Sequence, residues 1–250
     1  EKIIFLSTPQ NKSDLDFLLE LGVSAIKVGS DDFTNIPLLK YYSKTKLPIL
    51  ISCGMTTLKE IKTTLAAIGT LDGYPTALLL TTSEYPTLPQ NVNLQKLRTL
   101  SEKFPDIPLG YSDHTQGNLA SSIAISFGAC IFEKHFTIDK NMDGPDQKLS
   151  LDPTEFSQLV EKIRIIEKSI GKPRHNFFKS EIFFRDNLRK SLGAAKDIHP
   201  GIKISDSMIT TFRPGTGISP TMKNTIIGRK TKKLIKKIKR KEVVIKQKSR

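Results

Sequence analysis

Two histidines stand out because of where they fall relative to apolar segments of the chain. His114 and His135 end consecutive apolar runs that are typical of β-strands. If both runs are parallel strands of one sheet, their carboxyl ends share an edge and the two imidazoles can converge. Neutral imidazoles with nearby carboxylates suit a first-row divalent cation such as Mn²⁺ or Zn²⁺. With Glu133 and Asp146 close by in the sequence, the spacing predicts a metal site at His114 and His135.

The other apolar runs also end in polar residues. One ends in Lys27, and the hydroxyl residues at the ends of the others are Thr8, Ser30, Ser52, Ser83 and Ser112. An ammonium group with several hydroxyls can bind a phosphate or a carboxylate, because charge-assisted hydrogen bonds are the stronger ones. Each hydroxyl alone is more simply explained as a helix cap or a turn. Only the whole set predicts an anion site.

Alternating apolar and amphipathic segments must position these residues. The apolar runs are 3–7, 25–29, 49–53, 77–82, 108–111 and 129–136, and they recur roughly every 20–30 residues, the length of a βα unit. Capping patterns predict helices that start near Ser13, Thr57, Asn93 and Asp152. Serial βα units imply a parallel sheet covered by helices.

Two arrangements of that sheet remain open, a doubly wound sheet and a closed (β/α)₈ barrel. No Gly-x-Gly-x-x-Gly motif follows the first run, which weakens the dinucleotide-binding version. A barrel needs eight units, and the sequence supplies six. The chain opens directly into a strand-like run at Glu1, so we expect the first two units to lie upstream.

The composition and the apolar pattern of the sequence change after about residue 172. A polar connector leads to short apolar runs between Gly and Pro turns, which suggests a small β-rich domain. We therefore expect a partial barrel over 1–172, a linker over 173–189 and a small domain over 190–250.

The apolar runs and the cysteines of the sequence limit the class of protein that we expect. No apolar run approaches the roughly 20 residues that span a bilayer, and no signal peptide is visible, so we expect no membrane association. Cys53 and Cys130 lie in apolar runs and are expected to be buried free thiols, as suits the cytoplasm.

The net charge of +14 is concentrated at the end of the chain: Gly228–Arg250 holds 12 Lys and Arg against one acid, Glu242. Such a tail can bind nucleic acid or an acidic surface. The tail has no aromatic residues for base stacking, so we favour a solvated tail or the charged face of the small domain.

The segments that carry these residues, taken together, resemble the ordered motifs of bacterial N-acetylneuraminate (sialic acid) synthases. The resembling segments are 5–9, 27–30, 51–55, 81–86, 110–115, 132–137 and 144–146. Residues 213–220, Arg-Pro-Gly-Thr-Gly-Ile-Ser-Pro, resemble the core of the family's C-terminal antifreeze-like (SAF, β-clip) domain. The resemblance covers nearly the whole chain.

This resemblance implies a (β/α)₈ TIM barrel followed by a SAF domain, working as a domain-swapped homodimer. The implied reaction joins phosphoenolpyruvate to N-acetylmannosamine, giving N-acetylneuraminate and phosphate. The implied metal is Mn²⁺, with Mg²⁺ or Co²⁺ as alternatives. The chemistry matches a transferase that supplies cell-surface carbohydrate.

The resemblance also implies roles for individual residues. His114 and His135 match metal ligands; Thr8, Lys27, Ser30, Ser52, Ser83 and Ser112 match the phosphoenolpyruvate site; Tyr85 and Asp146 match sugar contacts; Arg213 matches an arginine that the partner subunit inserts into the sugar site; and Asp32 and Glu133 match acidic positions near the chemistry, with Lys27 also counted as catalytic. Asp32 departs from the Glu of some members and reaches less far. Ser83 departs from the Asn of others, and both side chains can donate a hydrogen bond.

Three alternatives stay open. The acceptor of the same reaction could instead be the precursor of legionaminic or pseudaminic acid. A different class is a basic nucleic-acid or acidic-surface binding protein built on an inactive barrel fragment. A third is a non-catalytic fragment of a longer enzyme.

Overall fold

The chain forms two compact units, Glu1–Lys172 and Pro173–Arg250, and the computed structural model describes residues 3–238 of them. Each unit is described by itself. Among the described residues, no helix has both the length and the apolar character needed to cross a membrane.

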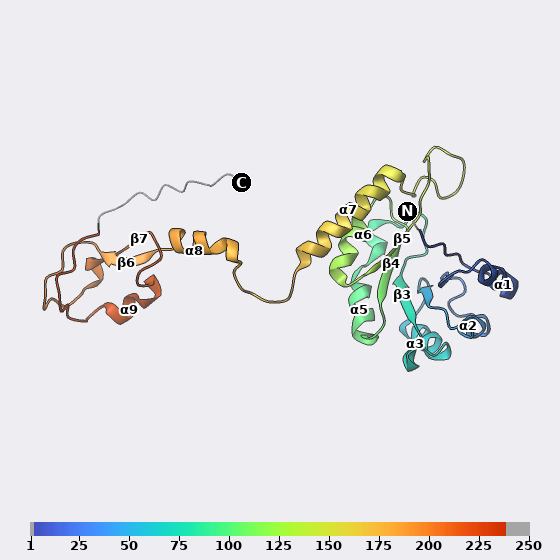
Figure 1. Ribbon diagram of the computed structural model, residues 1–250, viewed down its shortest axis with the longest axis horizontal. Helices are drawn as coiled ribbons and strands as arrows, with labels where there is room; N and C mark the ends of the chain where they lie inside the picture. Colours follow the sequence, from blue (N-terminus) through green and yellow to red (C-terminus); the bar gives the residue numbers. More distant parts are fainter. Residues whose placement is uncertain (1–2, 239–250) are drawn as a thin grey trace. The chain divides into compact units, whose positions relative to one another are not determined.

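The first unit is built on a parallel sheet of five strands in sequential order (Figure 1). The strands are β1 (Ile26–Val28), β2 (Ile49–Ser52), β3 (Thr76–Leu80), β4 (Leu109–Asp113) and β5 (Ile131–Lys134). Each strand pairs in parallel with the next along the chain. A doubly wound sheet reverses its strand order at a switch point, and this sheet does not. The sheet is therefore a curled half-barrel, and the prediction of a parallel α/β architecture is confirmed.

Helices connect the strands and cover the sheet. They are α1 (Lys12–Glu20), α2 (Ile36–Ser43), α3 (Leu58–Ala67), α4 (Pro89–Val92), α5 (Gln95–Lys103), α6 (Leu119–Ala124) and α7 (Pro153–Ile170). The predicted capping boxes at Thr57 and Asp152 both form. Helix α1 is capped by Asn11 instead of the predicted Ser13. Helix α2 was not predicted.

The core lies between the sheet and these helices. β3 is buried along its whole length, as expected for a strand covered on both faces. Leu65 of α3 and Leu97 of α5 are fully buried in the same cluster as Leu78 of β3. This packing fixes the carboxyl ends of the strands against one another.

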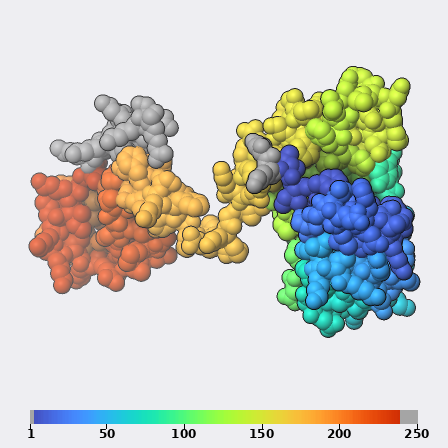
Figure 2. Space-filling model, turned by 45° about the vertical axis from the view of Figure 1, so that its right-hand side comes forward, coloured from blue at the N-terminus to red at the C-terminus, as the bar shows by residue number. Residues whose placement is uncertain are grey.

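The expectation of a strand over 3–7 was wrong. This segment is not a strand, and the side chains of Ile3 and Phe5 are 88% and 59% exposed. The backbone amide of Lys27 donates one hydrogen bond to the Ser7 carbonyl, at 3.3 Å. Figure 2 shows this dark blue segment on the surface of the first unit. No layer of described residues packs on its apolar side chains, so burial does not stabilise a strand there.

The two cysteines also differ from expectation in part. Both are free thiols, but only Cys53 is buried and Cys130 is exposed. Burial raises the pKa of the Cys53 thiol to about 12, so this side chain is an inert part of the core.

The second unit contains helix α8 (Ile182–Leu188), helix α9 (Lys223–Ile226) and the antiparallel pair of β6 (Ser191–Ala194) with β7 (Ile209–Phe212). Isolated bridges join Ile198 to Ile235 and Lys203 to Lys230. Helix α8 lies inside the segment that we expected to be a plain linker. The last part of the basic tail, 239–250, lies outside the described residues.

Candidate active site

A cavity of about 490 Å³ lies at the carboxyl ends of the strands of the first unit. Its lining includes Lys27 of β1, Ser52 of β2, Ser112 of β4 and Glu133 of β5. The loops after the strands add Ser30, Ser83, Tyr85, His114 and His135. The structure thus brings together nine of the residues that the sequence singled out, because strand ends of a parallel sheet face one edge.

The two imidazoles converge in this cavity. The ring centroids of His114 and His135 are 5.3 Å apart and the ring planes are inclined by 64°. Nδ1 of His114 lies 2.9 Å from the Thr82 carbonyl oxygen. A carbonyl only accepts, so this bond assigns the proton to Nδ1 and leaves Nε2 as the free lone pair. Burial lowers the pKa of His114, which keeps the ring neutral, the form that binds metals.

A carboxylate lies beside His135. Nδ1 of this histidine is 3.6 Å from Oδ2 of Asp146, and a carboxylate next to a ring nitrogen is common at metal-binding histidines. Asp146 itself does not appear in the cavity lining. The role of Asp146 as a sugar contact stays a prediction.

Tyr85 packs against both histidines. Its ring stacks on His114 with centroids 4.1 Å apart and meets the edge of His135 at 5.7 Å. Burial, followed by the negative charges of Asp146, Glu133 and Asp31, raises the pKa of the phenol. The hydroxyl therefore stays protonated at neutral pH and can donate a hydrogen bond to a ligand.

Lys27 is the cation of the cavity. Its Nζ donates to Oγ of Ser52 and to the Val28 carbonyl, each at 3.0 Å, and lies 3.4 Å from Oε2 of Glu133. That oxygen is buried and accepts no hydrogen bond from any described residue. Apart from its ion pair with Lys27, this oxygen has capacity to accept, so it marks a place where a ligand or a water can donate.

Gly54 allows two hydroxyls to close in beside the cavity. Its amide donates to Oγ of Ser30 at 2.9 Å. A Cβ at this position would lie 2.5 Å from Oγ of Ser83 and 2.7 Å from Oγ of Ser30. Any side chain at residue 54 would displace one of the two hydroxyls.

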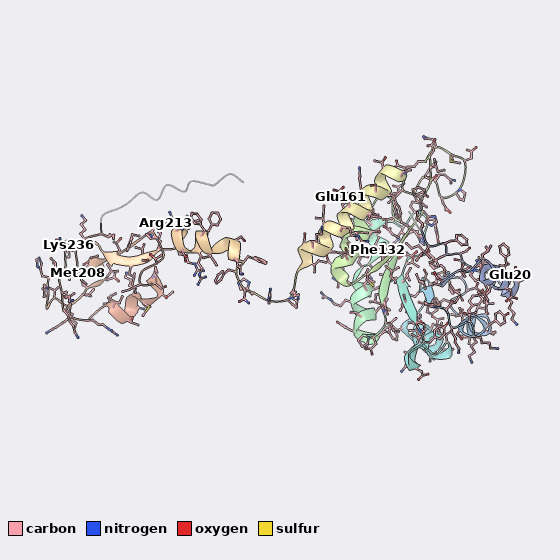
Figure 3. The ribbon with its side chains drawn as sticks, in the orientation of Figure 1. Glu20, Phe132, Glu161, Met208, Arg213 and Lys236 are labelled. Atoms are coloured by element: carbon pink, nitrogen blue, oxygen red, sulfur yellow. The ribbon has the colours of Figure 1, made fainter. Side chains whose placement is uncertain are left out.

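Besides Asp146, three predicted residues do not line the cavity. Thr8 lies in the segment before α1, Arg213 lies in the second unit, and Asp32 accepts a hydrogen bond from Asn35 at 2.9 Å. Arg213 is labelled in Figure 3. Its Nε donates to the Leu188 carbonyl at 2.8 Å. The neighbour of Asp32, Asp31, lines the cavity, and the role of Asp32 near the chemistry stays a prediction.

Sequence reasoning missed a buried ion pair directly behind the site. Nζ of Lys134 lies 3.3 Å from Oδ2 of Asp113, and the two side chains are 1% and 0% exposed. The two residues are paired in register on β4 and β5. Asp113 and Lys134 each directly precede one of the two histidines. This pattern predicts an ion pair only once the register of the strands is known.

The donor set fits a divalent cation with two protein ligands. In the described part of the chain, no three His, Cys, Asp or Glu side chains group closely enough to ligate one ion. His114 offers a free Nε2, His135 has a carboxylate beside it, and both rings line one cavity. Further coordination positions of an ion held there would be open to water or substrate, as in catalytic sites.

Comparisons with known proteins identify the family. The model of the NeuB family matches residues 1–175. The chain is 39% identical over 231 residues to the N,N'-diacetyllegionaminic acid synthase of Legionella pneumophila. The match covers 90% of this chain and 64% of that protein. The chain is 41% identical over 229 residues to the enzyme of the same name from Campylobacter jejuni, covering 91% of this chain and 68% of that protein.

The solved structures agree with the sequence relatives. The N-acetylneuraminic acid synthetase of Leptospira borgpetersenii, solved with citrate, superposes with a TM-score of 0.68 at 34% identity. The match covers 74% of this chain and 66% of that one. The chain spans less than two thirds of the length of the Legionella relative. With a family model matched over most of its length, the chain belongs to the NeuB family.

Proposed function

We propose that this chain carries the catalytic site of a nonulosonic acid synthase, which joins phosphoenolpyruvate to an N-acylated amino sugar and releases phosphate. The observation that carries the proposal is one cavity lined by both the Lys27–Ser52 pair and the two imidazoles of His114 and His135. A cation for an anionic donor and a metal-binding pair for an aldehyde thus stand side by side. Membership of the NeuB family supports the same reaction.

Lys27 and its neighbours are assigned to the donor. The ammonium, with the hydroxyls of Ser52, Ser30, Ser83 and Ser112 in the same lining, can bind the phosphate and the carboxylate of phosphoenolpyruvate. Charge-assisted bonds to such groups are short and strong. Their contribution is to hold the C3 carbon of the donor at the aldehyde, which replaces an encounter in solution by a positioned one.

His114 and His135 are assigned to a divalent cation, with Mn²⁺ proposed and Mg²⁺ or Co²⁺ as alternatives. When bound, such an ion polarises the aldehyde oxygen of the open-chain sugar as a Lewis acid. The residues themselves hold the ion with the free Nε2 of His114 and with the ring of His135, which lies beside Asp146.

Glu133 is assigned to the proton of the attacking water. In the proposed reaction, C3 of phosphoenolpyruvate attacks the aldehyde carbon, water adds at C2, and the tetrahedral species loses phosphate. Oε2 of Glu133 accepts no hydrogen bond from the described residues and forms an ion pair with Lys27 at 3.4 Å. Glu133 is preferred to Asp32 because only Glu133 borders the cavity. A positioned carboxylate can remove a proton as the bond to water forms.

The acceptor sugar separates the candidate synthases. The resemblance implies N-acetylmannosamine as the first candidate, whereas two relatives at 39% and 41% identity are N,N'-diacetyllegionaminic acid synthases. These relatives favour a diacetamido-dideoxy sugar as the acceptor. Phosphate release from phosphoenolpyruvate should be measured in the full-length protein with both sugars and the pseudaminic acid precursor, with and without Mn²⁺. Release that needs none of these sugars would contradict the proposed reaction.

His135→Ala tests the metal assignment. The variant should keep its fold, because His135 is partly exposed, and should lose phosphate release that depends on the divalent cation. Near-ultraviolet circular dichroism checks the fold, and a phosphate assay over a Mn²⁺ titration checks activity. Wild-type release at saturating Mn²⁺ would remove the metal assignment.

Arg213 tests the proposed homodimer. We propose that the second unit is an antifreeze-like domain and that it places Arg213 in the sugar site of a partner subunit. Arg213→Ala should then raise the KM for the sugar and leave that for phosphoenolpyruvate nearly unchanged. Unaltered sugar kinetics would count against the swapped dimer.

A further inference from the structure

The pair of Asp113 and Lys134 lies one residue before the two histidines on neighbouring strands. Asp113 pairs in register with Lys134, and Ser112 pairs with Glu133. Ser112 and Glu133 line the cavity. Because side chains alternate along a strand, Asp113 points to the opposite, helix-covered face of the sheet, where the hydroxyl of Ser121 on α6 contacts it. Lys134 also borders the cavity, and its ammonium reaches the Asp113 carboxylate. The next residue after each strand, His114 or His135, lines the cavity.

Lys134 contacts the residues on both sides of His114. Its ammonium lies 3.3 Å from the Asp113 carboxylate, just before the histidine, and donates to the Thr115 carbonyl, just after it. A cation on β5 therefore contacts both ends of the three-residue segment 113–115 at the end of β4. His135 follows Lys134 directly, so the two imidazoles are joined through this contact.

Asp113 is fully satisfied by hydrogen bonds. Oδ1 accepts from the amide of Thr115 at 2.8 Å and from its hydroxyl at 2.7 Å. Oδ2 accepts from the hydroxyl of Ser121 on α6 at 2.6 Å. Ser121 is itself fully buried. The strand end, the loop that carries His114 and the covering helix thus meet at one carboxylate.

Stability alone does not account for such a pair. Removing two charges from water is costly, and apolar residues of similar volume often serve a fold as well or better. The geometry points to a different use. We propose that Asp113 and Lys134 are positioning residues that set the distance and the inclination between the imidazoles of His114 and His135. The inference rests on the proposed function, in which these rings hold a divalent cation.

The test is Mn²⁺ binding to the full-length protein without substrates, measured by the electron paramagnetic resonance signal of free Mn²⁺. In the double variant Asp113→Leu with Lys134→Met, apolar side chains replace both charges, so no lone charge is left buried. We expect this variant to fold and to bind Mn²⁺ about 10–100-fold more weakly, the loss typical when support for metal ligands is removed. Lys134→Arg, which keeps the charge and the donors, should recover part of that loss.

A matched control separates positioning from general destabilisation. Thr70 and Thr76 share a buried hydrogen bond of 2.7 Å, and Thr76 begins β3 at the end of the sheet away from the cavity. Thr76→Val should lower the denaturation midpoint without changing the Mn²⁺ affinity. If the double variant behaves like this control, the positioning role is overturned.

Two further variants keep the test decisive. Ser121→Ala removes one bond to Asp113 and should weaken Mn²⁺ binding a few-fold in the same direction; should the double variant fail to fold, wild-type affinity in Ser121→Ala overturns the inference. His135→Ala serves as the reference for a lost ligand. Loss of binding in His135→Ala alone, with normal binding in the double variant, would reject the positioning role and leave the proposed function standing. Normal binding in His135→Ala would reject the metal site itself.

Discussion

Two lysine–carboxylate pairs lie on the sheet of the first unit, and they differ in almost every respect. Lys27 and Glu133 face the cavity, with side chains 14% and 42% exposed and a separation of 3.4 Å. The side chains of Asp113 and Lys134 are 0% and 1% exposed, and both oxygens of the Asp113 carboxylate are engaged. The residues of the two pairs on β5 are adjacent, so the local sequence does not distinguish their roles.

The difference lies in what each pair leaves open. Oε2 of Glu133 accepts no hydrogen bond from the described residues, whereas Asp113 has no capacity left for a ligand. An incompletely satisfied pair can be completed by substrate, and a complete pair can only hold its surroundings in place. Glu133 and Lys134 are neighbours on β5, but only the pair that contains Glu133 has an acceptor open to a ligand.

The largest effect should come from breaking the buried pair. Lys134→Met leaves the Asp113 carboxylate buried without its cation, and removing one partner of such a pair costs about 3–5 kcal/mol. Urea denaturation followed by circular dichroism should show this drop in the free energy of unfolding. A loss below about 1 kcal/mol would mean that Asp113 becomes protonated or hydrated, and the contrast between the pairs would fail.

Glu133→Gln should separate activity from stability on the cavity side. The amide keeps the shape of the side chain but cannot take up the proton of water, so phosphate release should fall by about 100-fold or more. The free energy of unfolding should change by less than about 1 kcal/mol, because the pair is partly solvated. Glu133→Asp, which keeps the carboxylate, is the control. Retained turnover in Glu133→Gln would return the proton to another group.

A smaller effect is expected from Lys27→Met. A hydrogen bond to a charged group contributes about 1.5–3 kcal/mol, so kcat/KM for phosphoenolpyruvate should fall about 10–100-fold. The KM for the sugar should change little. A fall that is confined to the sugar would move Lys27 from the donor end of the cavity to the acceptor end.

Much of the secondary structure that positions the site can be predicted from local sequence patterns. Thr57 and Asp152 cap the helices they were expected to cap, since a capping box needs only residues three apart. The convergence of His114 and His135 followed from the rule that parallel strands end at one edge. These inferences need no knowledge of which residues pair across the sheet.

The rest depended on information that only the fold supplies. The exposure of Ile3 and Phe5 depends on which layer covers them, and an apolar run of five residues does not record this. Asp31 lines the cavity and Asp32 does not. Which of two adjacent residues in a loop faces a cavity depends on the local backbone conformation. The Asp113–Lys134 pair requires the register of β4 on β5. Periodicity fixes the kind of element, but pairing decides which side chains meet.

Gly54 carries a final consequence, for the evolution of this site. The single hydrogen atom on its α-carbon is what lets the hydroxyls of Ser30 and Ser83 stand together. One methyl group there would widen the spacing of the hydroxyls and, if they bind the donor as we propose, alter which anions they suit. Part of the selectivity of the cavity is thus set at a position with no side chain, and a change in ligand preference could begin there without altering any residue that touches the ligand.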